Sequence, residues 1–531
     1  MPAVARRLPI WNGVTMDGPT DTPAGGGGIR LLRYHSPPGR WVIAATVLGS
    51  GMAAVDATVI GIALPTIGRD LHATVGTLQW VVTGYTLTLS SLLLLGGSLG
   101  DRFGRKRIFL TGVAWFALAS AACAASAGST QLIVTRVFQG IGGALLTPGS
   151  LAILEASFAP DDRNEAIGAW SGLGGVATAI GPLVGGYLIA AASWRWIFVI
   201  NIPIGVAVLV MSARHVPESR DASASHIDAG GAALATVALS AISYALIEGP
   251  ANGWSSATVL ASLAVGVIGS ASFVVVEHRS HSPMLPLGLL RNRQFTVTNG
   301  VTFVIYAGLG GVLFLLPVVL QIVDHYSPLE SGIALLPLTV VMLVFSARSG
   351  RVAAAIGPRL QMGVGPIVVG VGLALMVRVP DSRSYVTGVL PAVLVLAAGL
   401  ATTVAPLTAT ALNSVMDIHA GLASAVNNDV ARIGSLIAVA VLPALGGITG
   451  TSYLSPHALG HGFQRAVLIA ASWSVFGGVV AALGIRNPSV LPAGEPEAAD
   501  RGEGPDRSRR DAARHTASYC ALEATPLRAG E

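Results

Sequence analysis

Polar residues divide this 531-residue chain into long apolar stretches of similar length. A helix needs about 20 mostly apolar residues to cross the hydrocarbon core of a bilayer. Charged residues crowd the turn near residue 380, so the two stretches flanking it are the least distinct. The pattern predicts an all-α membrane protein with about fourteen spans: 41–65, 78–100, 108–127, 131–157, 165–191, 196–213, 228–247, 256–276, 295–320, 330–349, 360–379, 385–411, 420–447 and 465–485.

The distribution of arginine and lysine predicts the orientation of these spans. An even number of spans places both chain ends on one side of the membrane. The loops after even-numbered spans carry most of the basic residues, and the opposite loops hold only Arg69, Arg195, Arg378, Arg383 and Arg465. Basic loops stay preferentially in the cytoplasm. We therefore expect a multi-pass protein of the cell (inner) membrane with both termini cytoplasmic.

The loop between the second and third spans reads GGSLGDRFGRKR over residues 96–107. Its glycines permit a tight reversal, and its charges exclude it from hydrocarbon. A weaker copy, GRVAAAIGPR at residues 350–359, matches both glycines and the final basic residue, with Ala354 in place of Asp101. The two copies lie eight spans apart rather than six, which predicts two duplicated six-helix halves with two helices inserted between them.

This duplication predicts the organisation of the whole chain. The expected parts are a flexible cytoplasmic tail (1–40), an N-terminal six-helix half (41–214), two inserted helices (228–276), a cytoplasmic linker (277–294), a C-terminal six-helix half (295–486) and a disordered cytoplasmic tail (487–531).

Two ionisable residues lie inside predicted spans of the first half. Helical rise places Asp56 about 22 Å above the cytoplasmic end of its span, roughly 8 Å from the outer edge, and Arg136 at roughly the same depth. The two charges could therefore neutralise one another. Alternatively, Arg136 reaches the outer interface while Asp56 packs with hydroxyls such as Thr58. Buried ionisable groups in membranes are usually functional, which favours the pair.

The second half contains Asp429 and Arg432 three residues apart on one helical face. They can form a self-satisfied structural pair. A second protonation site or a site for a cationic substrate at Asp429 is the alternative. Other polar or soft residues on inward-facing spans are candidates for a substrate cavity: Met52, Gln139, Asn299, Tyr306, Thr402 and Asn413.

Composition supports a membrane protein, and the sequence lacks the motifs of several other functional classes. The chain is 52% hydrophobic and 11% charged, whereas soluble domains carry roughly 25% charged residues. Its net charge of +5 is explained by basic loops and tails, so we expect no nucleic-acid partner. Cys123 and Cys520 suggest no disulfide, and His457 and His461 lack further ligands, so we expect no metal site. The sequence has no ATPase-type glycine loop and no nucleophile elbow, which favours a non-enzyme driven by an ion gradient unless a separate ATPase subunit exists.

Several motifs together resemble the major facilitator superfamily of secondary transporters. The order G-x-L-x-D-R-x-G-R-K at residues 97–106 resembles the loop between helices 2 and 3 of that superfamily. The runs DATVIGIALP (56–65), RVFQG (136–140), GPLVGG (181–186) and WRWIF…NIPIG (194–205) resemble the fourteen-helix drug:proton antiporters. Gly61 stands where that family usually has Asn. Four-residue glycine spacings at 168 and 172 and at 181 and 185 also allow close helix packing.

The resemblance implies a proton-coupled exporter of drugs or toxic natural products. It also implies that the two halves move by alternating access. Asp56, Arg136 and Asp429 are the proton-coupling candidates. The gating motif comprises Gly97, Asp101, Arg102, Gly104, Arg105 and Lys106, and the antiporter motif comprises Gly172, Gly181, Pro182, Gly185 and Gly186. The expected partners are a lipophilic small molecule, protons and the lipid bilayer. We expect no cofactor, and we expect the protein to function as a monomer. A proton-coupled uptake symporter and a non-transporting receptor or scaffold are the alternatives.

Overall fold

The computed structural model describes residues 31–221, 228–280, 283–382, 384–415 and 420–487. Predictions for the two tails, including Cys520, lie mostly outside these residues. The helices are α1 (Pro37–Asp70), α2 (Val75–Phe103), α3 (Arg105–Ala124), α4 (Ser129–Ser157), α5 (Pro160–Ala191), α6 (Trp196–Val199), α7 (Asn201–His215), α8 (Ala229–Asn252), α9 (Ala257–Arg279), α10 (Arg293–Ile322), α11 (Pro328–Ala334), α12 (Leu336–Ile356), α13 (Pro358–Leu375), α14 (Leu390–Asn413), α15 (Ala420–Leu445) and α16 (Pro456–Gly484).

The described residues contain 14 helical segments long and apolar enough to cross a membrane, as the sequence predicts. Two of them combine a short helix with a longer one: α6 with α7 over Trp196–His215, and α11 with α12 over Pro328–Ile356. The two predicted spans on either side of residue 380, whose boundary was the least distinct in the sequence, form two separate segments, Pro358–Asp381 and Tyr385–Asn413. The predicted all-α membrane fold is confirmed.

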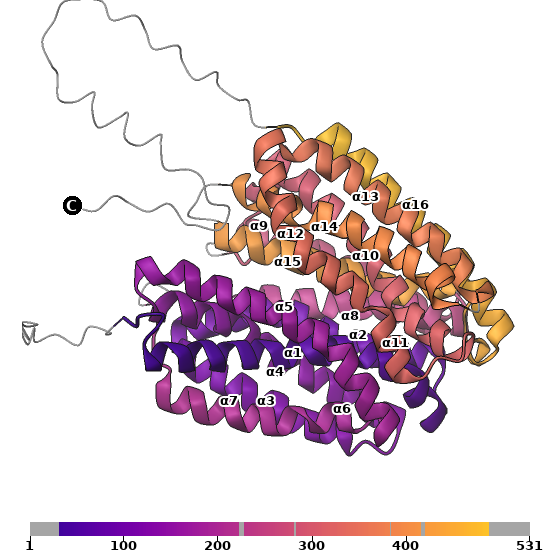
Figure 1. Ribbon diagram of the computed structural model, residues 1–531, viewed down its shortest axis with the longest axis horizontal. Helices are drawn as coiled ribbons and strands as arrows, with labels where there is room; N and C mark the ends of the chain where they lie inside the picture. The colour runs from indigo at the N-terminus through magenta and orange to yellow at the C-terminus, as the bar shows by residue number, and fades with distance from the viewer. Residues whose placement is uncertain (1–30, 222–227, 281–282, 383, 416–419, 488–531) are drawn as a thin grey trace, which may run out of the picture.

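The helices form two bundles that repeat the same packing, drawn indigo to magenta and orange to yellow in Figure 1. In the first bundle α1 packs on α5 and α7, and α4 packs on α2 and α3. In the second, α10 packs on α15 and α16, and α14 packs on α12 and α13. Each helix thus has its counterpart eight spans later, which is the offset that the repeated loop predicts.

The inserted helices α8 and α9 pack against each other, and α8 also contacts both bundles. Its neighbours are α2 in the first bundle and α15 in the second. Trp80 of α2 donates its indole N–H to Glu248 of α8 at 3.0 Å. By contrast, α9 exposes a row of large apolar side chains, among them Leu260, Val267 and Ile268. The pair therefore lies along the junction of the bundles, with α9 presenting an apolar outer surface suited to lipid.

Both copies of the glycine loop join their helices in the same way. Gly104 lies between α2 and α3 with a φ of 114°, and Gly357 lies between α12 and α13 with a φ of 85°. These are left-handed conformations that favour glycine. A Cβ on Gly104 would meet the Glu218 carboxylate at 2.7 Å, and one on Gly357 would clash with the side chain of Asn487. The chain reverses so tightly at both places that only glycine fits without strain.

Candidate functional site: a buried ion pair beside a cavity between the halves

Asp56 and Arg136 form an ion pair in the interior of the first bundle. Asp56 lies midway along α1, and Arg136 lies two turns into α4. Arg136 Nη1 donates to Asp56 Oδ2 at 2.5 Å, and the two side chains are 0% and 2% exposed. Their common depth, estimated from helical rise, therefore corresponds to direct contact. The alternative in which Arg136 reaches the membrane interface does not describe this structure.

Three more polar side chains complete the environment of Asp56. Gln139 Nε2 donates to Asp56 Oδ1 at 2.8 Å and to the Ser120 hydroxyl at 2.8 Å. Asn201, at the start of α7, donates its amide to the same carboxylate oxygen at 3.3 Å. Arg136 Nη1 also donates to Gln139 Oε1 at 2.7 Å. Arg136, Gln139 and Asn201 all donate to Asp56, an arrangement complementary to an ionised carboxylate.

The Arg136 guanidinium is held from two further directions. Its Nε donates to the Val81 carbonyl of α2 at 3.1 Å. Its Cζ lies 4.3 Å from the centre of the Tyr85 ring, also on α2, which permits a cation–π interaction. Among the described residues, Arg136 Nη2 has no hydrogen-bond partner. The contacts of the ion pair thereby link α1, α2 and α4. A change in the position of Asp56 would therefore alter the contacts of all three helices.

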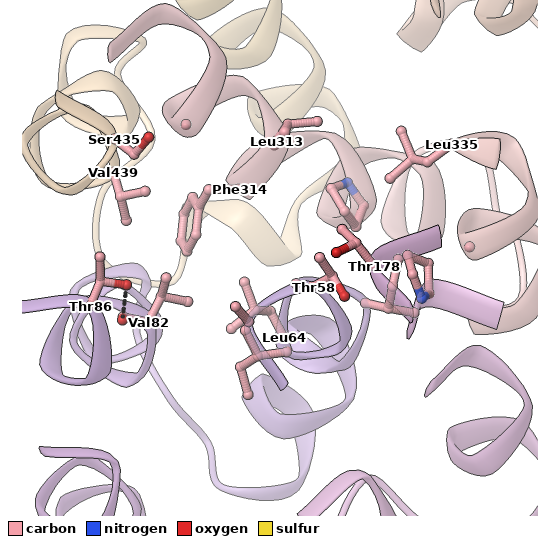
Figure 2. Close-up of a pocket in the computed structure, with 18 of the residues that line it drawn as sticks. Thr58, Leu64, Val82, Thr86, Thr178, Leu313, Phe314, Leu335, Ser435 and Val439 are labelled. Carbon is pink, nitrogen blue, oxygen red and sulfur yellow. Dashed lines mark hydrogen bonds between the residues drawn. The ribbon is translucent and has the colours of Figure 1, made fainter. Parts of the chain in front are cut away.

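A cavity of about 310 Å³ lies between the two bundles, next to this pair. Figure 2 shows Leu64, Val82 and Thr86 on its first-bundle side, opposite Phe314, Ser435 and Val439. α5, α11 and α12 complete its wall. Ala57 and Thr58, which directly follow Asp56 in α1, line the cavity, whereas the Asp56 carboxylate points to α4. Asp56 and Arg136 are thus not among the residues that line the cavity, although neighbours of Asp56 in α1 are.

The bundles are joined by hydrogen bonds at one end of the molecule, where α1 ends and α2 begins; we call it the distal side. Gln79 Nε2 donates to the carbonyls of Val439 and Ala440 on α15 at 2.6 and 3.0 Å. Tyr453 donates its hydroxyl to the Ala73 carbonyl at 2.8 Å, and other bonds join Gln321 to Ile62 and Val75 to Gly450. The cavity is therefore closed on the distal side, which lies to the right in Figure 1.

Helix α5 packs closely on α1 in its own bundle and, at its distal part, on α11 of the other bundle. A Cβ on Gly181 would clash with Thr58 Oγ1, and one on Gly185 would clash with Val59. A Cβ on Gly186 would approach Pro328 and Leu329, in the other bundle, at 2.7 Å. A Cβ on Gly172, nearer the beginning of α5, would meet no atom within 4 Å. Glycines of the antiporter motif thus allow tight packing only at its distal part, and α5 is open at its beginning.

The basic loop is held by contacts within its own bundle. Arg105 forms a 2.8 Å ion pair with Asp101 and donates its backbone N–H to the Ser219 carbonyl. Lys106 donates its backbone N–H to the Glu218 carboxylate at 3.1 Å. The second copy repeats this last contact, since Asn487 Oδ1 accepts from the backbone N–H of Arg359 at 3.0 Å. Gly97 and Arg102 complete the predicted gating motif on α2, and its gating role stays a prediction.

The remaining candidates for the substrate cavity lie outside its wall. Met52 packs in the core of the first bundle, and Gln139 belongs to the Asp56 network. Asn299 accepts a hydrogen bond from Asn427 at 3.1 Å, and the carbonyls of Tyr306 and Thr402 accept from serines of neighbouring helices. Asn413 is exposed at the end of α14. Their involvement in transport stays a prediction, while the wall itself consists of residues that the sequence did not single out.

Asp429 and Arg432 do not form the ion pair that their spacing permits. The described residues contain no salt bridge between them within 4.0 Å, and Asp429 Oδ1 is buried without a hydrogen-bond partner there. Arg432 lies close enough to Tyr85 of α2 and Tyr306 of α10 to interact with both electrostatically. The Arg432 charge thus lies near residues of both bundles as well as near Asp429, and a role of Asp429 in binding a proton or a ligand stays a prediction.

Sequence comparison identifies the family to which this architecture belongs. The model of the Major Facilitator Superfamily matches residues 46–439, most of both bundles. The chain belongs to the Major Facilitator Superfamily. It is 35% identical over 430 residues to the tetracenomycin C resistance and export protein of Streptomyces glaucescens, covering 81% of this chain and 78% of that protein. It is 36% identical over 425 residues to the methylenomycin A resistance protein of Bacillus subtilis (strain 168), covering 79% and 90%.

A solved transporter of low sequence similarity supports the fold. The crystal structure of a bacterial homologue of the human lysosomal transporter Spinster superposes with a TM-score of 0.62 at 17% identity, over 85% of this chain and 97% of that one. At this identity the likeness establishes the fold alone. The family match and the resistance and export relatives show that the chain is a multi-pass major facilitator transporter, a class of proteins that are not enzymes.

Proposed function

We propose that this transporter exports toxic, lipophilic small molecules from the cytoplasm in exchange for protons. The observation that carries the proposal is the buried Asp56–Arg136 pair between α1 and α4, because α1 also lines a cavity between the two halves. Secondary transporters bind substrate near the middle of the membrane at the interface of repeated halves, and an intramembrane carboxylate is a natural proton carrier. The resistance and export relatives support outward transport of drug-like molecules.

The proton step follows from the neighbours of Asp56. A proton on Asp56 would neutralise the charge that Arg136 and Gln139 now contact, so the guanidinium would lose its counter-charge. Because Arg136 also holds α2 through the Val81 carbonyl, its rearrangement would shift α1 and α2 together. These two helices line the cavity, so proton binding and substrate binding would exclude each other without direct contact between proton and substrate.

The orientation of the export cycle follows from the loops. We infer that the distal side faces outward and that the basic loops and both termini face the cytoplasm. The present structure, with its distal hydrogen bonds intact and the beginning of α5 open, would then be the state that accepts substrate from inside. Breaking the distal contacts and closing the proximal side would release substrate outside.

Two assays test the proposal in sequence. The chain is expressed in an efflux-deficient bacterium and challenged with tetracenomycin C, methylenomycin A and puromycin, the compounds named for its relatives. A compound that gives resistance is then loaded into proteoliposomes containing the purified transporter. Proton-gradient-driven movement opposite to the proton is expected. Movement in the same direction as the proton would identify a symporter, and no flux of any compound would favour a receptor or scaffold.

A further inference from the structure

The wall of the cavity between the halves carries no formal charge. Its 24 lining residues include no Asp, Glu, Lys, Arg or His. Its polar side chains all carry hydroxyls, five from threonine and one from serine: Thr58, Thr83, Thr86, Thr178, Thr339 and Ser435. An ionised group that entered this space would lose its hydration without gaining a counter-charge. The cavity therefore selects against charged ligands by the cost of desolvation.

Most of these hydroxyls donate to backbone carbonyls of the protein, whereas Thr83 Oγ1 has no hydrogen-bond partner among the described residues. Thr86 donates to the Val82 carbonyl at 3.1 Å, Thr178 to Gly174 at 3.0 Å, and Ser435 to the Tyr306 carbonyl of α10 at 3.2 Å. Their oxygen lone pairs stay available to a ligand, although none offers a full charge. Such a wall suits an apolar group with a few neutral polar atoms.

The nearest charges do not change this conclusion. Asp56 does not line the cavity and is neutralised by Arg136. Arg432 lies one helical turn before Ser435 in α15 and outside the wall. Asp429, three residues before Arg432, is also absent from the wall, so neither a cation nor an anion finds a counter-charge among the lining residues.

Gly61 provides the space into which a ligand can extend. It lines the cavity from α1, and a Cβ placed there would meet no atom closer than the Leu313 carbonyl and Pro317 Cγ, both at 4.0 Å and both in the other bundle. A methyl group is thus tolerated at this position, whereas a longer side chain would fill the cavity. At about 310 Å³ the space is at the small end of ligand pockets, so it holds part of a drug-sized molecule.

We propose that this cavity is the subsite for an uncharged, largely apolar part of the transported molecule, and that Gly61 determines how bulky that part can be. The inference rests on the proposed export function for its biological meaning, but it concerns binding alone. It is therefore tested without a proton gradient, and its outcome is separate from the outcome of the transport assays.

Three probes of similar size and different charge test the subsite. Binding of radiolabelled triphenylphosphine oxide (neutral), methyltriphenylphosphonium (cationic) and triphenylacetate (anionic) is measured on the purified transporter in nanodiscs. The neutral probe is expected to bind saturably, at least tenfold more tightly than either ion. Binding of an ion as tight as that of the neutral probe would overturn the proposal, and so would the absence of saturable binding by all three.

Substitutions at Gly61 locate the binding. Gly61→Leu is expected to weaken binding of triphenylphosphine oxide by tenfold or more, and Gly61→Ala by a smaller factor. Ala264→Leu adds similar bulk on the exposed surface of α9 and is the matched control, expected to leave binding unchanged. Equal binding by wild type and both Gly61 variants, with all proteins monodisperse, would place the probe elsewhere and overturn the assignment.

Discussion

At the scale of single residues, the central feature is a carboxylate that is buried yet fully provided with hydrogen-bond donors. Gln139 has a double role, since its amide N–H donates to Asp56 and its carbonyl accepts from Arg136. It therefore fixes both members of the ion pair in one geometry. Removing one partner from a buried charged network commonly costs about 1–3 kcal/mol or more.

Gln139→Leu is expected to reduce proton-driven export by tenfold or more while leaving the protein folded. The substitution removes the donor to Asp56 Oδ1 and the acceptor for Arg136, so the ion pair loses its fixed position. Transport into inverted membrane vesicles, normalised to the amount of protein, measures the effect. Gln131→Leu, on the exposed beginning of α4, is the control and should transport normally. Wild-type transport by Gln139→Leu would show that the network is structural only.

A second residue-scale feature lies on the distal side between α10 and α11. Burial, followed by the nearby charge of Asp381, raises the pKa of Asp324 to about 7 from an ordinary value of 3.8. Its Oδ2 is buried and has no hydrogen-bond partner among the described residues. A carboxyl whose pKa is raised by folding destabilises the fold when it ionises. That cost is absent below about pH 4, grows as the pH rises to 7 and is constant above 7.

Asp324→Asn should therefore raise the melting temperature, on the order of 1–3 °C at pH 8, and have little effect at pH 4.5. Thermal unfolding of the detergent-purified protein, followed by tryptophan fluorescence across this pH range, measures the difference. Asp381→Asn should give a weaker effect in the same direction, because it only removes the neighbouring charge. A stabilisation that is independent of pH would contradict the role of ionisation.

At the scale of helices, the distal closure depends on breaks in regular hydrogen bonding. Pro443 interrupts α15 and lacks the N–H that would otherwise bond to the Val439 carbonyl. Gln79 of α2 donates to that freed carbonyl from the opposite bundle. A proline in one half thus creates the acceptor through which the other half is held, and the contact can break without melting either helix.

Gln79→Leu is expected to shift the transporter toward a state open on the distal side. The loss of a buried hydrogen bond is worth about 1 kcal/mol, with a further cost for the unpaired Val439 carbonyl, so a roughly fivefold or larger change in population should follow. Spin labels at His72→Cys and Thr451→Cys, both exposed on the distal side, report the distance between the halves.

A new, longer distance component should appear in the Gln79→Leu protein, in a background where Cys123 and Cys520 are alanine. Gln131→Leu removes a glutamine on the same side that contacts only its own bundle, and it should leave the distances unchanged. Identical distance distributions for all three proteins would show that Gln79 does not hold the halves together.

The packing of α1 on α5 gives a second prediction at this scale. Gly185→Ala should lower the stability of the protein by about 1–3 kcal/mol, because its Cβ would occupy the position of the buried Val59 side chain. Gly172→Ala on the same helix meets open space and should be neutral or slightly stabilising. Thermal unfolding of the two variants compares them directly. Equal melting temperatures would contradict the assigned difference between the two glycines.

At the scale of the whole molecule, hydropathy and loop patterns were sufficient to predict the architecture. The length of a span is set by the bilayer, so apolar runs can be counted even where Arg378 and Asp381 interrupt them. The repeated loop supplied the offset of eight spans because its glycines obey a backbone constraint that survives in both copies. Helical rise alone brought Asp56 and Arg136 to the same depth.

The details of the site could not be predicted in the same way, because the depth of a residue in the membrane does not determine which way its side chain points around the helix. Gln139 lies one turn from Arg136 on the same face of α4, a spacing that could have assigned it to the ion pair rather than to the cavity. Asn201 carried a signal only through the NIPIG motif, and Ser120 carried none. Cavity-lining residues such as Leu313 resemble lipid-facing ones, since both surfaces are apolar, so only the packed fold separates them.

In an alternating-access cycle, the ion pair would bind the proton and the cavity would bind the substrate. Asp56 is paired with Arg136 and does not line the cavity, so the account requires that proton exchange be driven by movement of α1 rather than by direct competition. Its central claim is that Asp56 is the group that gains and loses the proton during export.

Substrate-induced proton release from the purified transporter tests this claim most directly. A pH-sensitive dye in weakly buffered detergent solution records the protons released when a compound that the resistance assay identifies is added. The account predicts release by wild type and none by Asp56→Asn, since an amide cannot titrate, while both proteins remain monodisperse. Wild-type proton release by Asp56→Asn would contradict the account and direct attention to Asp429, a carboxylate on α15 whose Oδ1 has no hydrogen-bond partner among the described residues.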